Sequence, residues 1–188
     1  MITLEQLLES RDRRAERQRS LLSLYPGKSL LCLTVMLPGP LKRSAMSLKI
    51  AAAAVEAVHG AFTTVYEDLR DLETGYEGYF IVDMDPLEAK KLAVHLEETH
   101  PLGRLFDLDV ILSLKKAVFA DGDADSGASS LKKAVFADGV RPLGREELGL
   151  EPRTCIICGR PVRECMRTRK HSTEELLSRI EAIIDYNL

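Results

Sequence analysis

Aromatic side chains are scarce in this chain: they make up 5% of its 188 residues, and tryptophan is absent. An excess of charge of one sign is lacking as well, because 26 basic and 29 acidic residues leave a formal net charge of −3. A nearly neutral chain has no global attraction to nucleic acids or anionic membranes. These shortages argue against a protein that binds nucleic acid or a membrane.

Long hydrophobic runs are missing too. The longest run, residues 30–37, is far shorter than the roughly 20 apolar residues of a membrane-spanning helix, and it predicts a buried strand. The first residues lack the basic and apolar regions of a signal peptide. We therefore expect a cytoplasmic protein whose four cysteines are thiols or metal ligands rather than disulfides.

The remaining composition is that of a folded domain, with 45% hydrophobic and 29% charged residues. The length suits one domain with a substantial core. We interpret residues 1–188 as a single domain in three segments. These are an α/β core (1–112), a duplicated arm or loop (113–140), and a cysteine and histidine motif followed by a terminal helix (152–188).

Hydrophobic periodicity, caps and turn residues divide the core segment into seven elements. We expect helices at 3–22, 44–58 and 86–98, and strands at 30–37, 62–69, 79–84 and 105–112. After the first helix the order is β-α-β-β-α-β, which is the split-βαβ order of ferredoxin-like sandwiches. The sequence thus predicts an α+β fold with a ferredoxin-like core, an N-terminal helix and a C-terminal helix anchored by cysteine and histidine. Both core helices would cover one face of the sheet and leave the other face open.

The last predicted core strand carries two carboxylates. Asp107 and Asp109 alternate there with apolar residues, so both side chains project from one face of the strand. Two neighbouring anions repel each other, and partial burial increases the cost. A divalent cation, Mg²⁺ or Mn²⁺, is a usual partner, and Mg²⁺ held in this way grips substrate phosphates in phosphoryl and nucleotidyl transfer. The alternative is a strand whose aspartates face water.

The paired carboxylates are also consistent with a second architecture. A polymerase-β-like nucleotidyltransferase core presents such pairs from neighbouring strands, and it is the alternative to the ferredoxin-like core. Architecture alone does not assign a function.

Basic residues near predicted turns are candidates for binding phosphate. Lys42 and Arg43 follow the Pro-Gly-Pro turn at 38–40, at the start of the helix predicted at 44–58, where helix amides and basic side chains cooperate. The alternative for each is a solvated helix start. His100, shortly before the aspartates, is interpreted as either a general base or a helix C-cap.

An internal duplication follows the core. Residues 113–122 (SLKKAVFADG) recur identically at 130–139, and a small polar linker joins the copies. Asp121, Asp123 and Asp125 imitate the start of a calcium loop, but the required glycine and closing glutamate are missing. We interpret the segment as a duplicated hairpin arm or loop rather than an ion site.

The C-terminal segment contains a C-x2-C-x6-C-x5-H pattern. Its members are Cys155, Cys158, Cys165 and His171. Three thiolates and one imidazole suit a closed tetrahedral zinc site, which would be structural because no coordination position stays open. The terminal helix would begin at Ser172, which has capping-box spacing to Glu175. The alternative is a set of reduced thiols that pack against this helix.

Four stretches carry a common resemblance. They are S-R-D-R-R-A-E-R-Q at 10–18, L-P-G-P-L-K at 37–42, H-P-L-G-R-L-F-D-L-D at 100–109, and the C-terminal cysteine and histidine pattern. Together, and in this order, they resemble the apo-citrate lyase phosphoribosyl-dephospho-CoA transferase family, the holo-acyl-carrier-protein synthase of citrate lyase. The duplicated segment at 113–140 departs from this pattern, since relatives carry a shorter connection there.

The resemblance implies a specific reaction. Members transfer a prosthetic group from 2′-(5″-triphosphoribosyl)-3′-dephospho-CoA to a serine of the citrate lyase acyl-carrier (gamma) subunit, and pyrophosphate leaves. Asp107 and Asp109 would hold Mg²⁺ on the triphosphate, and His100 would take the serine proton. The expected catalytic and substrate-binding set is completed by Arg104, Arg11, Arg14, Lys42, Arg43 and Gly103.

Two non-catalytic alternatives stay open at this point. A zinc-stabilised module would bind nucleic acid through Arg167, Arg169 and Lys170, although the negative net charge and the lack of nearby aromatics oppose it. A protein that only binds a carrier subunit would use the two aspartates as a salt-bridged face.

Overall fold

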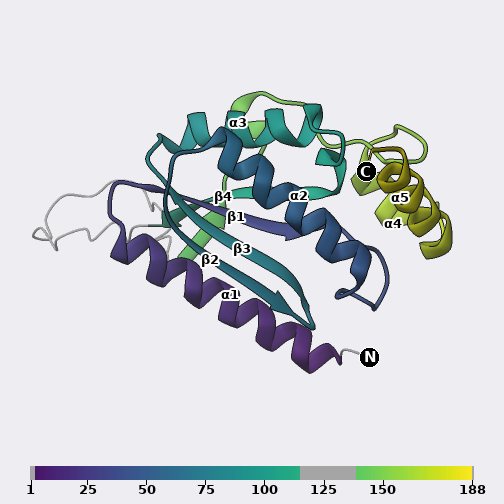
Figure 1. Cartoon of the computed structure of the whole chain (residues 1–188), viewed down its shortest axis with the longest axis horizontal. Helices are drawn as coiled ribbons and strands as arrows, with labels where there is room; N and C mark the ends of the chain where they lie inside the picture. The colour runs from purple at the N-terminus through teal and green to yellow at the C-terminus, as the bar shows by residue number, and fades with distance from the viewer. Residues whose placement is uncertain (1–2, 115–138, 188) are drawn as a thin grey trace, which may run out of the picture.

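The computed structural model describes residues 3–114 and 139–187, and a five-stranded antiparallel sheet lies at its centre (Figure 1). The strands are β1 (Ser29–Val35), β2 (Thr64–Leu72), β3 (Gly75–Val82), β4 (Phe106–Leu114) and β5 (Gly139–Pro142). They lie in the order β2-β3-β1-β4-β5. The α-helices of the described part are α1 (Leu4–Leu24), α2 (Ala45–Ala61), α3 (Pro86–Thr99), α4 (Val162–Thr168) and α5 (Thr173–Asn187).

The elements predicted for residues 1–112 are confirmed, with ends that shift by a few residues, and the fold is α+β. Local caps explain the helix starts. Thr3 and Gln6 form a capping box at α1, and the Asp85 carboxylate accepts hydrogen bonds from the first turn of α3. β5 and α4 were not predicted, because each is short and neither shows a clear hydrophobic period.

The two faces of the sheet bury different side chains. α2 and α3 cover one face, where the main core includes Leu31, Phe80 and Val110 (Figure 1). On the other face, Leu21 of α1 packs in a second cluster that contains Cys32. The prediction of an open second face is therefore wrong, since α1 lies across it.

The charged residues of α1 explain why the sequence predicted an open second face. Its arginines pair with acids that rise from the sheet: Arg17 lies 2.7 Å from Asp68 of β2, and Arg14 lies 2.8 Å from Glu77 of β3. A helix with so few apolar residues is expected to be solvated, but here these ion pairs add to the packing of Leu21 and hold α1 on the sheet.

β4 and β5 pair at the two ends of the duplicated segment. The two strands pair from Ile111 with Pro142 to Leu114 with Gly139, so the last core strand is longer than predicted. Most of the predicted duplication at 113–140, namely residues 115–138, lies outside the described residues. Among the described residues, no helix is both long and apolar enough to cross a membrane.

Candidate functional site

Asp107 and Asp109 share one face of β4, as predicted. Asp107 lies opposite Thr34 of β1 and Asp109 opposite Cys32, and Cys32 belongs to the cluster under α1. The Thr34 hydroxyl donates a hydrogen bond to Asp107 Oδ2 at 3.3 Å. Their side chains are 41% and 39% exposed, so carboxylate oxygens of both residues reach solvent.

Each aspartate already has a basic neighbour. The Lys90 ammonium lies 3.1 Å from Asp109 Oδ1, and Arg153 Nη2 lies 3.4 Å from Asp107 Oδ1. Burial raises the pKa of Asp107, and the charge of Asp109 raises it further, while Arg153 acts in the opposite sense. The protein thus balances part of the negative charge with its own side chains. The ion pairs nevertheless leave part of each aspartate side chain exposed.

A basic cavity of about 360 Å³ reaches Thr34, the hydrogen-bond partner of Asp107. The N-terminal half of α1, the end of β1 and the start of β3 enclose it, and three of the predicted substrate-binding residues line it. These are Arg11, Arg14 and Lys42. Thr34 also lines the cavity and contacts Asp107, so it connects the basic wall to the carboxylates.

A buried carboxylate orients the central arginine of this cavity. Glu77 is only 4% exposed and accepts hydrogen bonds from Arg14 Nε at 3.0 Å and Nη2 at 2.8 Å. Tyr79 donates its phenolic proton to the same carboxylate at 2.5 Å. Since Tyr79 and burial fix the orientation of Glu77, Arg14 is held in place by a preorganised partner.

Lys42 lines the same cavity. Its ammonium donates a hydrogen bond to the Leu37 carbonyl at 2.6 Å, and partial burial lowers its pKa. Arg43, the neighbouring residue, points elsewhere. It forms a paired hydrogen bond with Asp71, with both distances 2.8 Å, near the β2–β3 turn.

The His100-Pro-Leu-Gly-Arg stretch is placed away from the cavity. His100 Nδ1 accepts a hydrogen bond from the Leu102 amide at 3.0 Å, and its ring packs 4.9 Å from that of Phe106 between ring centres. Phe106 belongs to the core under α2 and α3, on the face of β4 opposite Asp107. Of the two interpretations of His100, the geometry matches the helix cap, since His100 is the C-cap of α3.

Gly103 packs against α3, and Arg104 contacts the segment that carries the cysteine pattern. A Cβ on Gly103 would lie 2.4 Å from the Leu96 carbonyl oxygen, so only glycine allows this turn to approach α3. Arg104 donates a hydrogen bond to the Thr154 carbonyl, one residue before the cysteine pattern. The structure therefore brings neither residue into the basic cavity.

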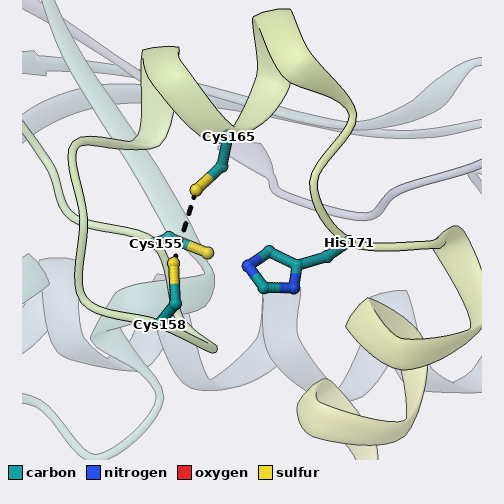
Figure 2. A group of neighbouring side chains, drawn as sticks. All are labelled: Cys155, Cys158, Cys165 and His171. Atoms are coloured by element: carbon teal, nitrogen blue, oxygen red, sulfur yellow. Dashed lines mark hydrogen bonds between the residues drawn. The ribbon is translucent and has the colours of Figure 1, made fainter.

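The cysteine and histidine pattern closes into one cluster (Figure 2). The four ligand atoms of Cys155, Cys158, Cys165 and His171 lie within 4.8 Å of one another. A bridge between Thr154 and Pro161 closes the knuckle that holds the first two cysteines, and α4 supplies the third.

The chemistry of the cluster suits a metal. The neighbouring imidazole of His171 lowers the pKa of the Cys158 thiol to about 6, which favours the thiolate. His171 Nε2 points toward the sulfurs, and it is buried without a hydrogen-bond partner among the described residues (Figure 2). A buried nitrogen left without a partner is costly, whereas a metal ion would satisfy it.

Sequence reasoning missed three residues around the aspartates: Lys90, Glu97 and Arg153. Lys90 and Glu97 are 4% and 3% exposed on the buried stripe of α3. Two charged residues seven positions apart on the apolar stripe of a helix indicate that each pairs with a polar group of the neighbouring strand. Arg153 carried no signal except its place just before the cysteine pattern.

Two carboxylates beside a cavity lined by arginine and lysine form the set of groups that transferases use on phosphorylated substrates. The comparisons with known proteins agree with this class. The model of the apo-citrate lyase phosphoribosyl-dephospho-CoA transferase family matches residues 2–119 and 134–187, and the chain belongs to that family. The match leaves out residues 120–133, inside the duplicated segment.

Relatives from several bacteria cover nearly the whole chain. A probable apo-citrate lyase phosphoribosyl-dephospho-CoA transferase of Streptococcus pyogenes is 34% identical over 186 residues, which is 97% of this chain and 85% of the relative. The Escherichia coli protein of that name is 29% identical over 189 residues, 98% of this chain and 89% of the relative. A protein named CitXG from Haemophilus influenzae is 35% identical over 187 residues, 97% of this chain, but the chain spans only 35% of it.

Proposed function

We propose that this protein transfers the phosphoribosyl-dephospho-CoA group to apo-citrate lyase, using 2′-(5″-triphosphoribosyl)-3′-dephospho-CoA as donor. The acceptor is a serine hydroxyl of the acyl-carrier subunit. The family match supports the reaction. The observation that carries the proposal to particular residues is the cavity with Arg11, Arg14 and Lys42, one hydrogen bond away from Asp107 through Thr34.

The reaction is a displacement at phosphorus. The serine oxygen forms a bond to the phosphorus attached to the ribose, the bond from this phosphorus to the pyrophosphate oxygen breaks, and the serine proton leaves to a base or to solvent. Such reactions depend on positioning and on neutralising charge. Arg11, Arg14 and Lys42 would bind the triphosphate and stabilise the charge that develops on pyrophosphate. The proposed contributions of four other residues would be indirect, because their contacts lie elsewhere: Arg43 with Asp71, Gly103 with α3, Arg104 with Thr154 and His100 with the Leu102 amide.

A magnesium ion fits the carboxylate pair. Asp107 and Asp109 are hard oxygen donors, and about two fifths of each side chain is exposed. We propose that both residues hold Mg²⁺ or Mn²⁺, which supplies charge neutralisation on the phosphates when bound. Lys90 and Arg153 would keep both carboxylates oriented toward the ion.

Zinc is the metal we propose for the cysteine and histidine cluster. Three thiols and an imidazole form the soft donor set of a closed structural zinc site. The buried, unpartnered His171 Nε2 and the convergence of the sulfurs support it. The ion would fix α4 and α5 to the loop that follows Arg153, rather than take part in the transfer.

We further propose that the core is ferredoxin-like. The antiparallel strand order β2-β3-β1-β4 and the placement of α2 and α3 on the same face support this assignment over the polymerase-β-like alternative. We also propose that residues 1–188 are one domain and that the protein works in the cytoplasm, where thiols stay reduced.

A divalent-dependent pyrophosphate-release assay tests the function. Purified protein, apo-citrate lyase and the triphosphoribosyl donor should release pyrophosphate in proportion to the carrier subunit, and mass spectrometry should show the mass added to its serine. Carrier subunit with that serine replaced by alanine is the control. Absence of both signals with Mg²⁺ and with Mn²⁺ would overturn the proposal.

A further inference from the structure

Arg153 connects two parts of the molecule that have separate proposed roles. Its backbone belongs to the knuckle of the cysteine and histidine cluster, because its carbonyl accepts a hydrogen bond from the Val162 amide at 2.9 Å and Cys155 follows two residues later. Its side chain leaves the knuckle and reaches the start of β4. There Nη1 donates to the Phe106 carbonyl at 3.0 Å, and Nη2 lies 3.4 Å from Asp107 Oδ1.

A guanidinium is suited to this place. β5 pairs only with the far end of β4, from Ile111 onward, so the edge near Phe106 needs other partners. Arg153 contacts the Phe106 carbonyl and two carboxylates, those of Asp107 and Glu97. Its planar fork offers five donors in fixed directions, which the ammonium of a lysine does not.

Glu97 fixes the other side of this guanidinium. Its carboxylate is 3% exposed and accepts the Leu108 amide proton at 2.8 Å, so α3 and β4 determine its position. The side chain of Arg153 is only 17% exposed between them. The arginine is therefore constrained at its backbone by the knuckle and at its side chain by Glu97, and Asp107 is the partner that it can orient.

We propose that Arg153 is a positioning residue that sets the orientation of Asp107 and so couples the cysteine and histidine cluster to the transfer site. The inference rests on the proposed function, in which Asp107 holds the cation on the triphosphate. Ordering of the knuckle would then be transmitted to Asp107 through the Arg153 side chain.

Arg145 provides a matched control. Its side chain is 15% exposed, close to the 17% of Arg153, and it also pairs with Glu97, at 3.4 Å from Oε2. Its other contacts are with Glu98 and the Glu151 carbonyl, and none with Asp107 is present in the described residues. Arg145→Gln thus removes a similar buried cation from Glu97 but leaves Asp107 untouched.

The experiment is a double-mutant cycle on turnover. Arg153→Gln should lower kcat by at least about 30-fold with a KM for the donor within about threefold, whereas Arg145→Gln should keep kcat within about threefold. Added to Asp107→Asn, Arg153→Gln should cause no further loss beyond about threefold, because its effect passes through Asp107. Arg153→Lys, which keeps the charge but not the fork, should recover only part of the rate.

Two results would overturn the inference. One is a loss for Arg153→Gln that multiplies with the loss for Asp107→Asn, and the other is an equal loss for Arg145→Gln. Zinc content and thermal midpoints are measured on every variant, and Arg153→Lys replaces Arg153→Gln if the latter does not fold. If the wild-type protein has no transferase activity, the proposed function fails by itself. The cycle is then run on thermal midpoints, where Arg153 and Asp107 must be coupled while Arg145 and Asp107 are not.

Discussion

The buried ammonium group of Lys90 lies 3.1 Å from Oδ1 of Asp109 and donates a second hydrogen bond to the Leu108 carbonyl at 2.9 Å. Lys90 is 4% exposed, so its charge depends on these partners. Asp109 therefore stabilises a buried cation of α3, and in the proposed site its partly exposed carboxylate would also bind the metal ion. Asp107, whose partner Arg153 also has Glu97, does not stabilise a buried cation alone.

This difference separates the effects of two conservative substitutions. Asp107→Asn and Asp109→Asn should each lower turnover by at least about a hundredfold, the scale of losing one electrostatic stabiliser of a transition state. Asp109→Asn should also cost about 1 kcal/mol of unfolding free energy, because asparagine keeps an acceptor oxygen for Lys90 but no charge. Turnover assays and urea denaturation measure both effects. Asp71→Asn, at the exposed pair with Arg43, is the control.

Near-normal turnover in both aspartate variants would refute the metal-binding role. The aspartates would then be only a salt-bridged face. An equal loss of stability in the two variants would instead show that Lys90 does not depend on Asp109 as the contacts indicate.

The basic cavity leads to a prediction about substrate affinity. Arg11 is exposed and lines the cavity, so Arg11→Ala should raise the KM for the triphosphate donor about tenfold or more and leave the thermal midpoint nearly unchanged. Arg13→Ala, on the same helix, removes an exposed pair with Glu9 and should leave the KM within about twofold. Steady-state kinetics at two salt concentrations measure the effect. Equal KM values for the two variants would move the triphosphate away from this cavity.

Much of this site was predictable because its local signals are strong. Strand alternation placed both aspartates on one face, and cysteine spacing gave the cluster. The cavity was not predictable, because its walls come from α1, β1 and β3, and the pairing of Arg14 with Glu77 depends on how α1 lies across the sheet. Long-range ion pairs leave no period in the sequence.

For His100, in contrast, the sequence motif suggested a role near the aspartates that the position of its side chain does not favour. Asp107 follows His100 closely in sequence, but a turn lies between them, and His100 packs on Phe106, which lies on the opposite face of β4 from Asp107. The His100 backbone caps α3, and its imidazole accepts the Leu102 amide proton and packs on Phe106, while Asp107 faces the side of α1. Proximity along a chain predicts a shared site only when the residues also share a face.

The duplicated segment should be dispensable. Deleting residues 115–131 removes one period and joins Leu114 to Lys132, and the same sequence results whichever copy is removed. Leu114 and Gly139 are paired at the ends of β4 and β5, and residues 132–138 suffice to connect them. We expect soluble protein with transfer activity within about twofold of wild type, measured by the pyrophosphate assay. Insoluble protein or lost activity would show that the second copy is structural.

The last prediction concerns the cysteine and histidine cluster. Purified protein should contain about one zinc ion per chain, and His171→Asn should lower this content to less than half, because it removes one of four ligands. His95→Asn, at an exposed histidine of α3, is the matched control and should keep the full content. Metal analysis of the three proteins gives the stoichiometry.

Zinc removal should act locally before it acts on the sheet. Metal binding and folding are coupled, so a chelator should increase hydrogen exchange in α5 (Thr173–Asn187) before it does so in β4 (Phe106–Leu114). Cys158→Ser should lower the thermal midpoint and impair transfer only indirectly, through the knuckle that holds Arg153. Protein without zinc, whose cluster thiols are all alkylated in the native state, would identify them as a packed set of reduced cysteines. The transfer site would then have to work without a zinc ion in the neighbouring cluster. Arg153 would be held by the Thr154–Pro161 bridge and by its contacts with Glu97, Phe106 and Asp107.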